Sequence, residues 1–513
     1  MRSPTVARVG ARFIAAAMTA LLAAALVVPG AGAQGKGDLV VGVTSDPDTL
    51  FPWKATQFQA FALLGLIYDS LVEFDQDLNV VPAIAEGWDV SDDGLAITFN
   101  IREGVTFHDG KPLTSADVKA SLDAILDEAT GAVARSSLAS VASVDAPDDS
   151  TVILNLTSPD AGILAGLAGP NMAIVSKDDT EEGLSSTPNG TGAFAFGSRK
   201  PNESLTLVGN ESYWREGQPT LASVEFRVIP DESSIVDGLR SGNVQLTILN
   251  DPLVATTAEG DGISISRTPQ LAYHALMINH NRPPLDDLNV RLAMQCAVDR
   301  QEVLDTAALG EGAVVGPITS PAYLSDPSAR PCPEKDVEKA KQYLADAGYP
   351  DGGIQIGTIV SQGEYATSVA EAQSLQAQLA EVGIDLQIEA MEIGTYVDRW
   401  LAADFDTAVA LNGGRPDPDV MYGRYFPSTG NLNQIASFSS PELDELFARG
   451  KATSDPAERQ QIYDDISSVL EDNAVWLWMF SSYNYAATTQ DVTNFTPMPN
   501  NQFYQYLRTT TVE

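Results

Sequence analysis

The sequence predicts an α/β protein built from two or three lobes. Strand-like and helix-like patterns alternate along the whole chain, and no repeat of about 20 to 50 residues is visible. The 513 residues, less a leader of 33, are too many for a single hydrophobic core. Because no Ser/Gly-rich linker divides the chain, we expect the lobes to be interwoven.

The first 33 residues have the pattern of a secretory signal peptide. Arg2, Arg8 and Arg12 precede an apolar run over 13–28, and a small-residue site follows, which predicts cleavage after Ala33. A membrane anchor is the alternative, but a spanning helix needs about 20 apolar residues. With no cysteine at the cleavage point to carry a lipid anchor, we expect a periplasmic or secreted protein.

The chain is strongly acidic, with 69 Asp and Glu against 30 Lys and Arg and a formal charge of −39. Removing the leader, which holds three arginines and no acid, takes the charge to −42. We therefore expect no nucleic-acid partner, because binding to phosphates depends on basic residues. It also keeps a protein soluble and monomeric, so we expect a monomer.

Local patterns place the first elements. Residues 39–43 form a short apolar run that is typical of a buried strand, and residues 384–388 alternate as a half-buried strand does. Four helices are expected: after the capping box Thr114–Asp117, from Asp336 to Gly348, before Gly383, and after Asp455. A strand over 474–480 follows the last of them.

The two cysteines suit one disulfide. Cys296 lies in a helical pattern and Cys332 in a loop between two prolines, and an even count in an exported chain favours a bridge. Two buried free thiols remain the alternative. A metal site needs more ligands than this pair supplies.

No motif indicates catalysis. The chain has no Gly-x-Ser-x-Gly, no His-Glu-x-x-His and no phosphate-binding loop. The pair Gly190 and Gly192 precedes a strand pattern and not a helix, so a tight turn is favoured there over a dinucleotide site. Its three histidines, His108, His274 and His280, are poor material for a metal site. We therefore expect no enzyme, no metal and no cofactor, although the many carboxylates leave a hidden acid/base pair open.

Four segments together resemble the extracellular solute-binding proteins of family 5, whose members bind oligopeptides, dipeptides, nickel chelates and some oligosaccharides. The first lies within 68–122 and the others follow along nearly the whole mature chain. The matching motifs are PAIAEGW at 82–88, IREGVTFHDG at 101–110, ADV at 116–118, GTG at 190–192, NESYW at 210–214, VIPD at 228–231, LRSG at 239–242, IN at 278–279, VRLA at 290–293, AVDR at 297–300 and KAKQYLADAGY at 339–349.

The resemblance implies a type II periplasmic-binding-protein fold, with two lobes around a cleft and an extra subdomain. Lobe 1 is expected to comprise 34–72, 184–268 and 484–513, the inserted subdomain 73–183, and lobe 2 269–483. The chain should cross between the lobes near 267–269 and 481–483, and His108 should be structural.

The resemblance also implies a function. We expect the extracytoplasmic substrate-binding subunit of an ABC importer, which captures oligopeptides or similar elongated solutes by lobe closure and delivers them to the permease subunits at the inner membrane. An oligosaccharide or metal-chelate receptor is the alternative within the family. A secreted hydrolase or a chaperone-like binder is the alternative from another class.

The loop 412–419 (NGGRPDPD) resembles the cleft loop of the family. In its peptide receptors an aspartate four residues before the equivalent of Pro418 pairs with the free amino group of the ligand, and here Gly414 stands at that position. Asp417 or Asp419 could substitute, or could form a turn beside the prolines. Arg415 could pair with a ligand carboxylate or with these acids. On this alignment Gly414→Asp is expected to strengthen peptide binding.

Other candidates for ligand contact are aromatic or amide side chains. Aromatic rings give rigid contact area with a polar edge, and amides can donate to ligand carbonyl groups. A place in the core is the alternative for the tryptophans, and an Asx turn is the alternative for the asparagines. The candidates are Trp53, Tyr273, Asn279, Asn281, Trp400, Asn412, Trp476 and Trp478.

Overall fold

A computed structural model describes residues 37–362 and 365–513. The signal peptide predicted for residues 1–33 lies outside the described residues. Within the described ranges, no helix is long and apolar enough to cross a membrane.

The main element is a mixed sheet of twelve strands, which confirms the predicted α/β class. In spatial order its strands are β16 (Ile384–Met391), β15 (Ile354–Ser361), β17 (Thr407–Asn412), β13 (Tyr273–Ile278), β18 (Trp476–Thr489), β11 (Leu246–Leu249), β1 (Asp38–Val43), β10 (Ser223–Val228), β9 (Ser204–Gly209) and β8 (Phe194–Lys200), and β12 (Ile263–Pro269) and β14 (Gly312–Val314) also pair with β18.

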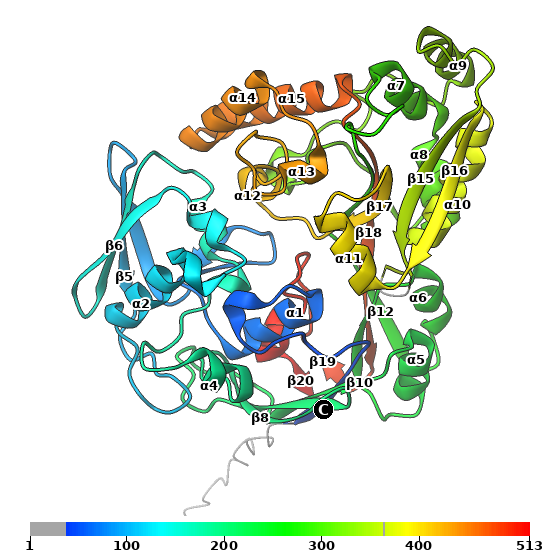
Figure 1. The fold of residues 1–513 in the computed structure, drawn as a ribbon. Coiled ribbons are helices and arrows are strands. Elements are labelled where there is room, and N and C mark those ends of the chain that lie inside the picture. The colour runs from blue at the N-terminus through cyan, green and yellow to red at the C-terminus, as the bar shows by residue number, and fades with distance from the viewer. Residues whose placement is uncertain (1–36, 363–364) are drawn as a thin grey trace, which may run out of the picture. The chain divides into compact units, whose positions relative to one another are not determined.

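The long strand β18 joins two parts of this sheet. Its first residues pair with β13, and its last residues pair with β11 and β12 (Figure 1). Pro269 at the end of β12 lies opposite Tyr483, and residues 270–272 then lead into β13. The two expected chain crossings therefore lie side by side, while the lobe boundaries stay a prediction.

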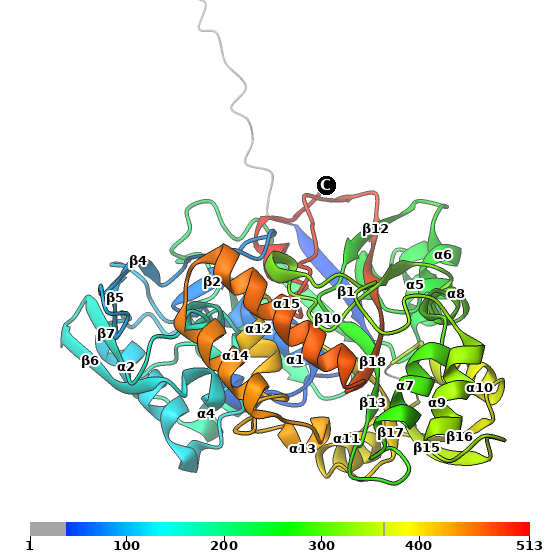
Figure 2. The same cartoon turned by 90° about the horizontal axis from the view of Figure 1, so that it is seen from above.

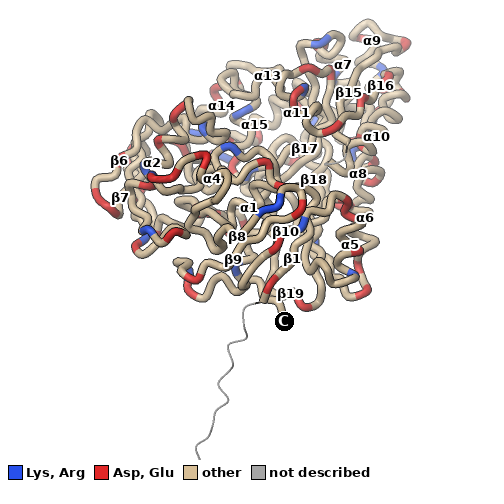
Figure 3. The backbone as a smooth tube through the Cα atoms, turned by 60° about the horizontal axis from the view of Figure 1, so that its bottom comes forward, with Lys and Arg blue, Asp and Glu red and all other residues tan. Residues whose placement is uncertain are grey.

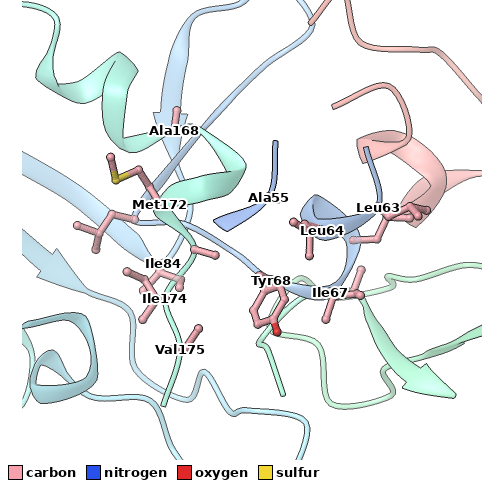
Figure 4. Close-up of a cluster of buried hydrophobic side chains, with 14 of the residues drawn as sticks. Ala55, Leu63, Leu64, Ile67, Tyr68, Ile84, Ala168, Met172, Ile174 and Val175 are labelled. Carbon is pink, nitrogen blue, oxygen red and sulfur yellow. The ribbon is translucent and has the colours of Figure 1, made fainter. Parts of the chain in front are cut away.

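Four clusters of buried apolar side chains form two core regions. The first core region gathers around β1, β8–β11 and the helices α1 (Phe58–Ile67), α2 (Ser115–Leu126), α3 (Ile163–Leu167), α4 (Glu181–Ser186), α5 (Glu232–Arg240) and α6 (Pro252–Ala258). Figure 4 shows part of it, where Tyr68 lies between Leu64 and Ile67 on one side and Ile84 and Ile174 on the other.

The second core region gathers around β13, β15–β17 and the first half of β18. Helices α14 and α15 pack side by side in both views (Figures 1 and 2). The helices of this region are α7 (Leu288–Ala297), α8 (Arg300–Ala308), α9 (Val337–Asp346), α10 (Ser368–Ala380), α11 (Ile393–Leu401), α12 (Pro418–Tyr422), α13 (Asn433–Ala436), α14 (Pro441–Ala452) and α15 (Pro456–Asp472).

Smaller sheets complete the first core region. Four strands pack beside α2 in the order β4 (Ala85–Val90), β5 (Ala96–Ile101), β7 (Thr151–Leu156) and β6 (Val141–Asp148). Two further pairs join β2 (Val72–Phe74) to β3 (Val80–Pro82) and β19 (Val492–Thr493) to β20 (Thr511–Val512).

The local predictions of helices and turns are confirmed. Thr114 and Asp117 form the capping box of α2, and the side chains of Asp336 and Asp455 cap α9 and α15. Gly383 takes φ 83°, a left-handed value that favours glycine, between α10 and β16. The last strand is longer than expected, because it continues to Thr489.

Cys296 of α7 and Cys332 form a disulfide with their Cα atoms 5.0 Å apart. His108 lies in a turn, where its imidazole contacts the carbonyl of Gly192 at 3.0 Å and the amide of Gly190 at 3.3 Å. Both contacts are to backbone atoms, in keeping with a structural role for this histidine.

Candidate functional site

A cavity of about 720 Å³ lies between the two core regions. Residues of the first core region on its wall include Phe58, Phe61 and Asn171, and residues of the second include Trp400 and Tyr425. This volume falls within the roughly 300–1,000 Å³ typical of small-molecule sites. We refer to it as the central cavity.

Aromatic side chains form much of its wall. Trp400 of α11 lies beside Met277, with the indole nitrogen 3.2 Å from the thioether sulfur. The hydroxyl of Tyr396 donates to the carbonyl of Val409 at 2.9 Å. Burial raises the pKa of Tyr396 well above its usual value, so this hydroxyl stays neutral. These rings offer rigid apolar surface with few rotatable bonds.

The loop that follows β17 depends on a glycine. Gly414 takes φ 57°, and a Cβ added there would lie 2.1 Å from the backbone oxygen of Leu271. The next residue is held by Ser320, whose hydroxyl donates to the carbonyl of Arg415 at 3.1 Å. An aspartate at position 414 would therefore fit only if the backbone of this loop or of Leu271 shifted, which argues against the expectation that Gly414→Asp strengthens peptide binding.

Two arginines carry the charge of the central cavity. Of the described residues that line it, only Arg415 and Arg424 have charged side chains. The side chain of Arg415 makes no hydrogen bond or ion pair within the described ranges. Arg424 lies over the ring of Tyr425 at 5.2 Å and reaches the carbonyl of Met421 at 3.4 Å. Neither guanidinium is neutralised by a carboxylate there.

Desolvation lowers the pKa of Arg415 to about 9, and the positive charge of Arg424 contributes further. Arg415 nevertheless stays protonated at neutral pH. The surroundings are unusual for this chain, in which acidic residues are spread over the helices and loops of both core regions (Figure 3).

The two aspartates of the loop form bonds within the protein. Asp417 caps α12, accepting from the amides of Asp419 and Val420, and also pairs with Arg459 at 3.0 Å. Asp419 accepts from Arg459 at 3.0 Å and from the hydroxyl of Tyr463 at 2.8 Å. Burial, followed by the charge of Asp417, raises the pKa of Asp419 to about 7. Both acids hold the loop against α15.

Four of the aromatic candidates lie in the cores. Trp476 and Trp478 of β18 and Tyr273 of β13 have no exposed surface and pack in the second core region. Trp53 is buried in the first, where its indole N–H donates to the carbonyl of Ala173 at 3.0 Å. These four are not on the wall of the central cavity. Their location does not suit direct contact with a ligand.

The two asparagines after β13 form a turn. The amide of Asn279 donates to the carbonyls of Ala403 and Phe405, each at 3.1 Å. Its side-chain oxygen accepts from the backbone N–H of Asn281 at 3.1 Å. These bonds correspond to the Asx-turn alternative. Among the sequence candidates, the cavity wall holds Trp400, Asn412, Gly414 and Arg415.

Several cavity residues were not anticipated from the sequence. Arg424 and Tyr425 follow α12, while Phe58, Asn171 and Asn501 come from three distant segments of the first core region. No local motif marks them. The only sequence feature that points to any of them is the place of Arg424, about one helical turn after the predicted cleft loop.

The two core regions also touch beside the central cavity. Lys451 of α14 pairs with Asp160 at 3.0 Å, and its carbonyl accepts from the amide of Ala161 at 2.9 Å. A second cavity of about 460 Å³ lies there and shares Arg424 with the central one. In the part of the chain that the structure describes, no group of three His, Cys, Asp or Glu side chains could hold a metal ion.

Comparison with protein-family profiles shows the family of this chain. The profile of the bacterial extracellular solute-binding proteins, family 5 Middle, matches residues 79–433. The chain belongs to family 5 of the extracellular solute-binding proteins. This confirms the predicted family and its type II two-lobed fold. The family is made up of solute-binding proteins.

Individual family 5 proteins are similar over almost the full length. The glutathione-binding protein GsiB of Escherichia coli K12 is 27% identical over 487 residues, which cover 91% of this chain and 93% of GsiB. AgaA of A. tumefaciens R10, solved with agropinic acid, has a TM-score of 0.83 at 28% identity, with 93% of this chain and 99% of AgaA covered. DppA of Helicobacter pylori, solved with the peptide STSA, has a TM-score of 0.81 at 26% identity, with 93% and 98% covered.

Proposed function

We propose that this protein is the extracytoplasmic substrate-binding subunit of an ABC importer. It captures a peptide or another solute of similar size in the central cavity and delivers it to permease subunits at the inner membrane. The observation that carries the proposal is the central cavity, whose wall is shared between the two core regions. A ligand there contacts both regions only when they close, so its binding energy favours closure.

The relatives support this role and leave several ligand classes open. GsiB is named for glutathione, DppA was solved with a tetrapeptide and AgaA with agropinic acid. All are compatible with a cavity of about 720 Å³. We propose that the contacts to the ligand come from Trp400, Asn412 and Arg415, with Arg424 and Tyr425 beside them.

The location and state of the protein follow from the same role. We propose export through the leader that ends at Ala33, residence in the periplasm, and action as a monomer. The two core regions would be the lobes that close, with β18 and the link from β12 to β13 between them. Binding and release without chemical change of the solute fit a family made up of solute-binding proteins.

Thermal unfolding of the purified mature protein tests the proposal. After removal of any bound solute by unfolding and refolding, the protein is screened against peptides, sugars, organic acids and metal chelates. A true ligand at 100 times its Kd should add about 2.7 kcal/mol to the free energy of unfolding. Unchanged melting temperatures throughout, with consumption of any solute, would favour a hydrolase and contradict the proposal.

A further inference from the structure

We propose that the central cavity selects small anionic solutes, with Arg415 and Arg424 as the charged groups that hold a carboxylate or a similar anion. This inference rests on the proposed function, because it names the chemical class of the solute that the cavity captures.

The charge on the cavity wall is the first observation. A chain with 69 acidic residues places only Arg415 and Arg424 as charged side chains among the described residues of this wall. A ligand amine would find no carboxylate there, whereas a ligand carboxylate would meet one or two guanidinium groups. Arginine suits this task, because its planar fork can donate two parallel hydrogen bonds to a carboxylate.

The lack of a carboxylate partner among the described residues is the second observation. Arg459 lies 35 residues along the chain from Arg424, and it satisfies both nearby aspartates. Asp417 and Asp419 therefore pair with Arg459 and not with Arg415 or Arg424. Arg415 has no ion pair within the described ranges. Two like charges facing one cavity repel each other, and an anionic ligand removes that repulsion.

The backbone keeps the arrangement in place. A Cβ at Gly414 would collide with the backbone of Leu271, so the position from which an aspartate could bind an amine carries no side chain. The carbonyl of Arg415 is held by Ser320, and α12, which precedes Arg424, is anchored through Asp417 to Arg459. The two guanidinium groups thus project from fixed backbone positions, which limits the entropy lost on binding.

Uncharged surfaces supply the rest of the site. The amides of Asn412 and Asn501 and the rings of Phe58 and Trp400 line the same cavity. They suit a solute that has an anionic group at one end and a neutral, partly apolar body.

The test uses sets of solutes that share one carbon skeleton. Each set holds a free dipeptide, its N-acetyl derivative with one net negative charge, and the N-acetyl amide with none. Sets of hydroxy acids and dicarboxylates with their amides are added, and Kd is measured by calorimetry for every compound that raises the melting temperature. We expect the anionic member to bind most tightly in each set and the neutral amide to bind about 10-fold or more weakly.

Variants then test whether the two arginines bind the anionic group of the solute. Arg415→Gln and Arg424→Gln should each weaken the anionic probe by about 10- to 150-fold, the range of a hydrogen bond to a charged group. Arg449→Gln is the matched control, since it removes the same charge from an exposed position on α14 outside the cavity. It should leave Kd unchanged, and circular dichroism checks the fold of all three.

The outcomes separate the two proposals. Tightest binding by free-amine dipeptides or by neutral amides, or equal losses in Arg415→Gln and Arg449→Gln, would overturn the anion selectivity while the receptor role stands. Failure of every compound in all sets to stabilise the wild-type protein would count against the receptor role itself.

Discussion

Two groups of charged residues lie close together around the loop after β17 and helix α12, and their surroundings differ sharply. Asp417 is buried, Asp419 is nearly so, and both pair with the guanidinium of Arg459, so their charges are compensated within the protein. Arg415 and Arg424 face the central cavity, and within the described ranges neither is paired with a carboxylate. We call the first group the paired cluster and the second the arginine pair.

The difference shows how to separate charges that hold the structure from charges that are available to a ligand. A charge that is buried and compensated cannot turn to a ligand without leaving its partner uncompensated, which costs several kcal/mol. A charge that lines a cavity and has no partner carries that cost already, and a ligand of opposite sign reduces it. Position in the sequence does not distinguish the two groups, because Asp417 and Asp419 lie between Arg415 and Arg424 within one short segment.

Removing Arg459 from the paired cluster should lower stability far more than removing Arg415 from the arginine pair. Arg459→Met leaves two buried carboxylates beside each other, and should lower the free energy of unfolding by about 3–5 kcal/mol. Arg415→Met relieves repulsion from Arg424, and should leave the free energy of unfolding of the empty protein unchanged or raise it slightly. Urea unfolding at pH 7.5 measures both. Equal losses of stability would remove the distinction between the groups.

The loop that carries both groups should be intolerant of a side chain at Gly414. Gly414→Ala combines a left-handed backbone with a collision against the backbone of Leu271. Gly131→Ala is a matched control, because Gly131 has φ 67° and open space around the added Cβ. We expect a loss of about 1–2 kcal/mol for Gly131→Ala and about 1–3 kcal/mol more for Gly414→Ala.

Thermal unfolding of the two alanine variants measures the difference. An equal loss in both would show that the loop can move away from Leu271. In that case the position could carry an aspartate after all, and the cavity could acquire a partner for a ligand amine.

The fold was largely predictable because its signals are local. The capping box at Thr114, the caps Asp336 and Asp455, and the glycine at 383 each act within one turn of the chain, so a single sequence reveals them. The strand pairing at β18 is a different matter. It joins strands about 200 or more residues apart, and the resemblance to a known family implies only the nearby chain crossings, not this pairing.

The site was predicted less well, for two physical reasons. Trp476 and Trp478 are residue types that are common on binding surfaces, but the strand that carries them is buried on both faces. Residue type alone does not reveal this burial. The cavity residues Arg424 and Asn501 come together only through tertiary folding. Gly414 could be interpreted as a lost aspartate until the carbonyl of Leu271 showed that the position requires glycine.

The paired cluster should also give a pH-dependent contribution to stability. The pKa of Asp419 is raised from an ordinary value of 3.8 to about 7 in the folded protein, through burial and then Asp417, against the opposing effects of Arg459 and Tyr463. Between these values the unfolded state is ionised and the folded state is protonated, so unfolding releases a proton. The contribution of Asp419 to the free energy of unfolding therefore falls as pH rises from about 4 to about 7.

Asp419→Asn removes this contribution. Relative to the wild type, the variant should gain at least about 1 kcal/mol in free energy of unfolding between pH 4.5 and pH 7.5. Urea unfolding at both pH values measures the difference, which cancels the titration of groups that the two proteins share. A difference that is independent of pH would mean that Asp419 is ionised throughout, as a carboxylate fully compensated by Arg459 would be.

The smallest effect concerns the ion pair that joins the two core regions outside the cavity. Lys451→Met breaks its contact with Asp160, and because the lysine is partly exposed the loss is up to about 1 kcal/mol. If the contact forms only on closure, this loss should weaken every ligand by up to about 5-fold, whatever its charge. Lys335→Met is the control, since its pair with Glu381 lies within the second core region and should not affect Kd. A loss confined to anionic ligands would instead make Lys451 a third member of the anion site, reaching it through the cavity that shares Arg424.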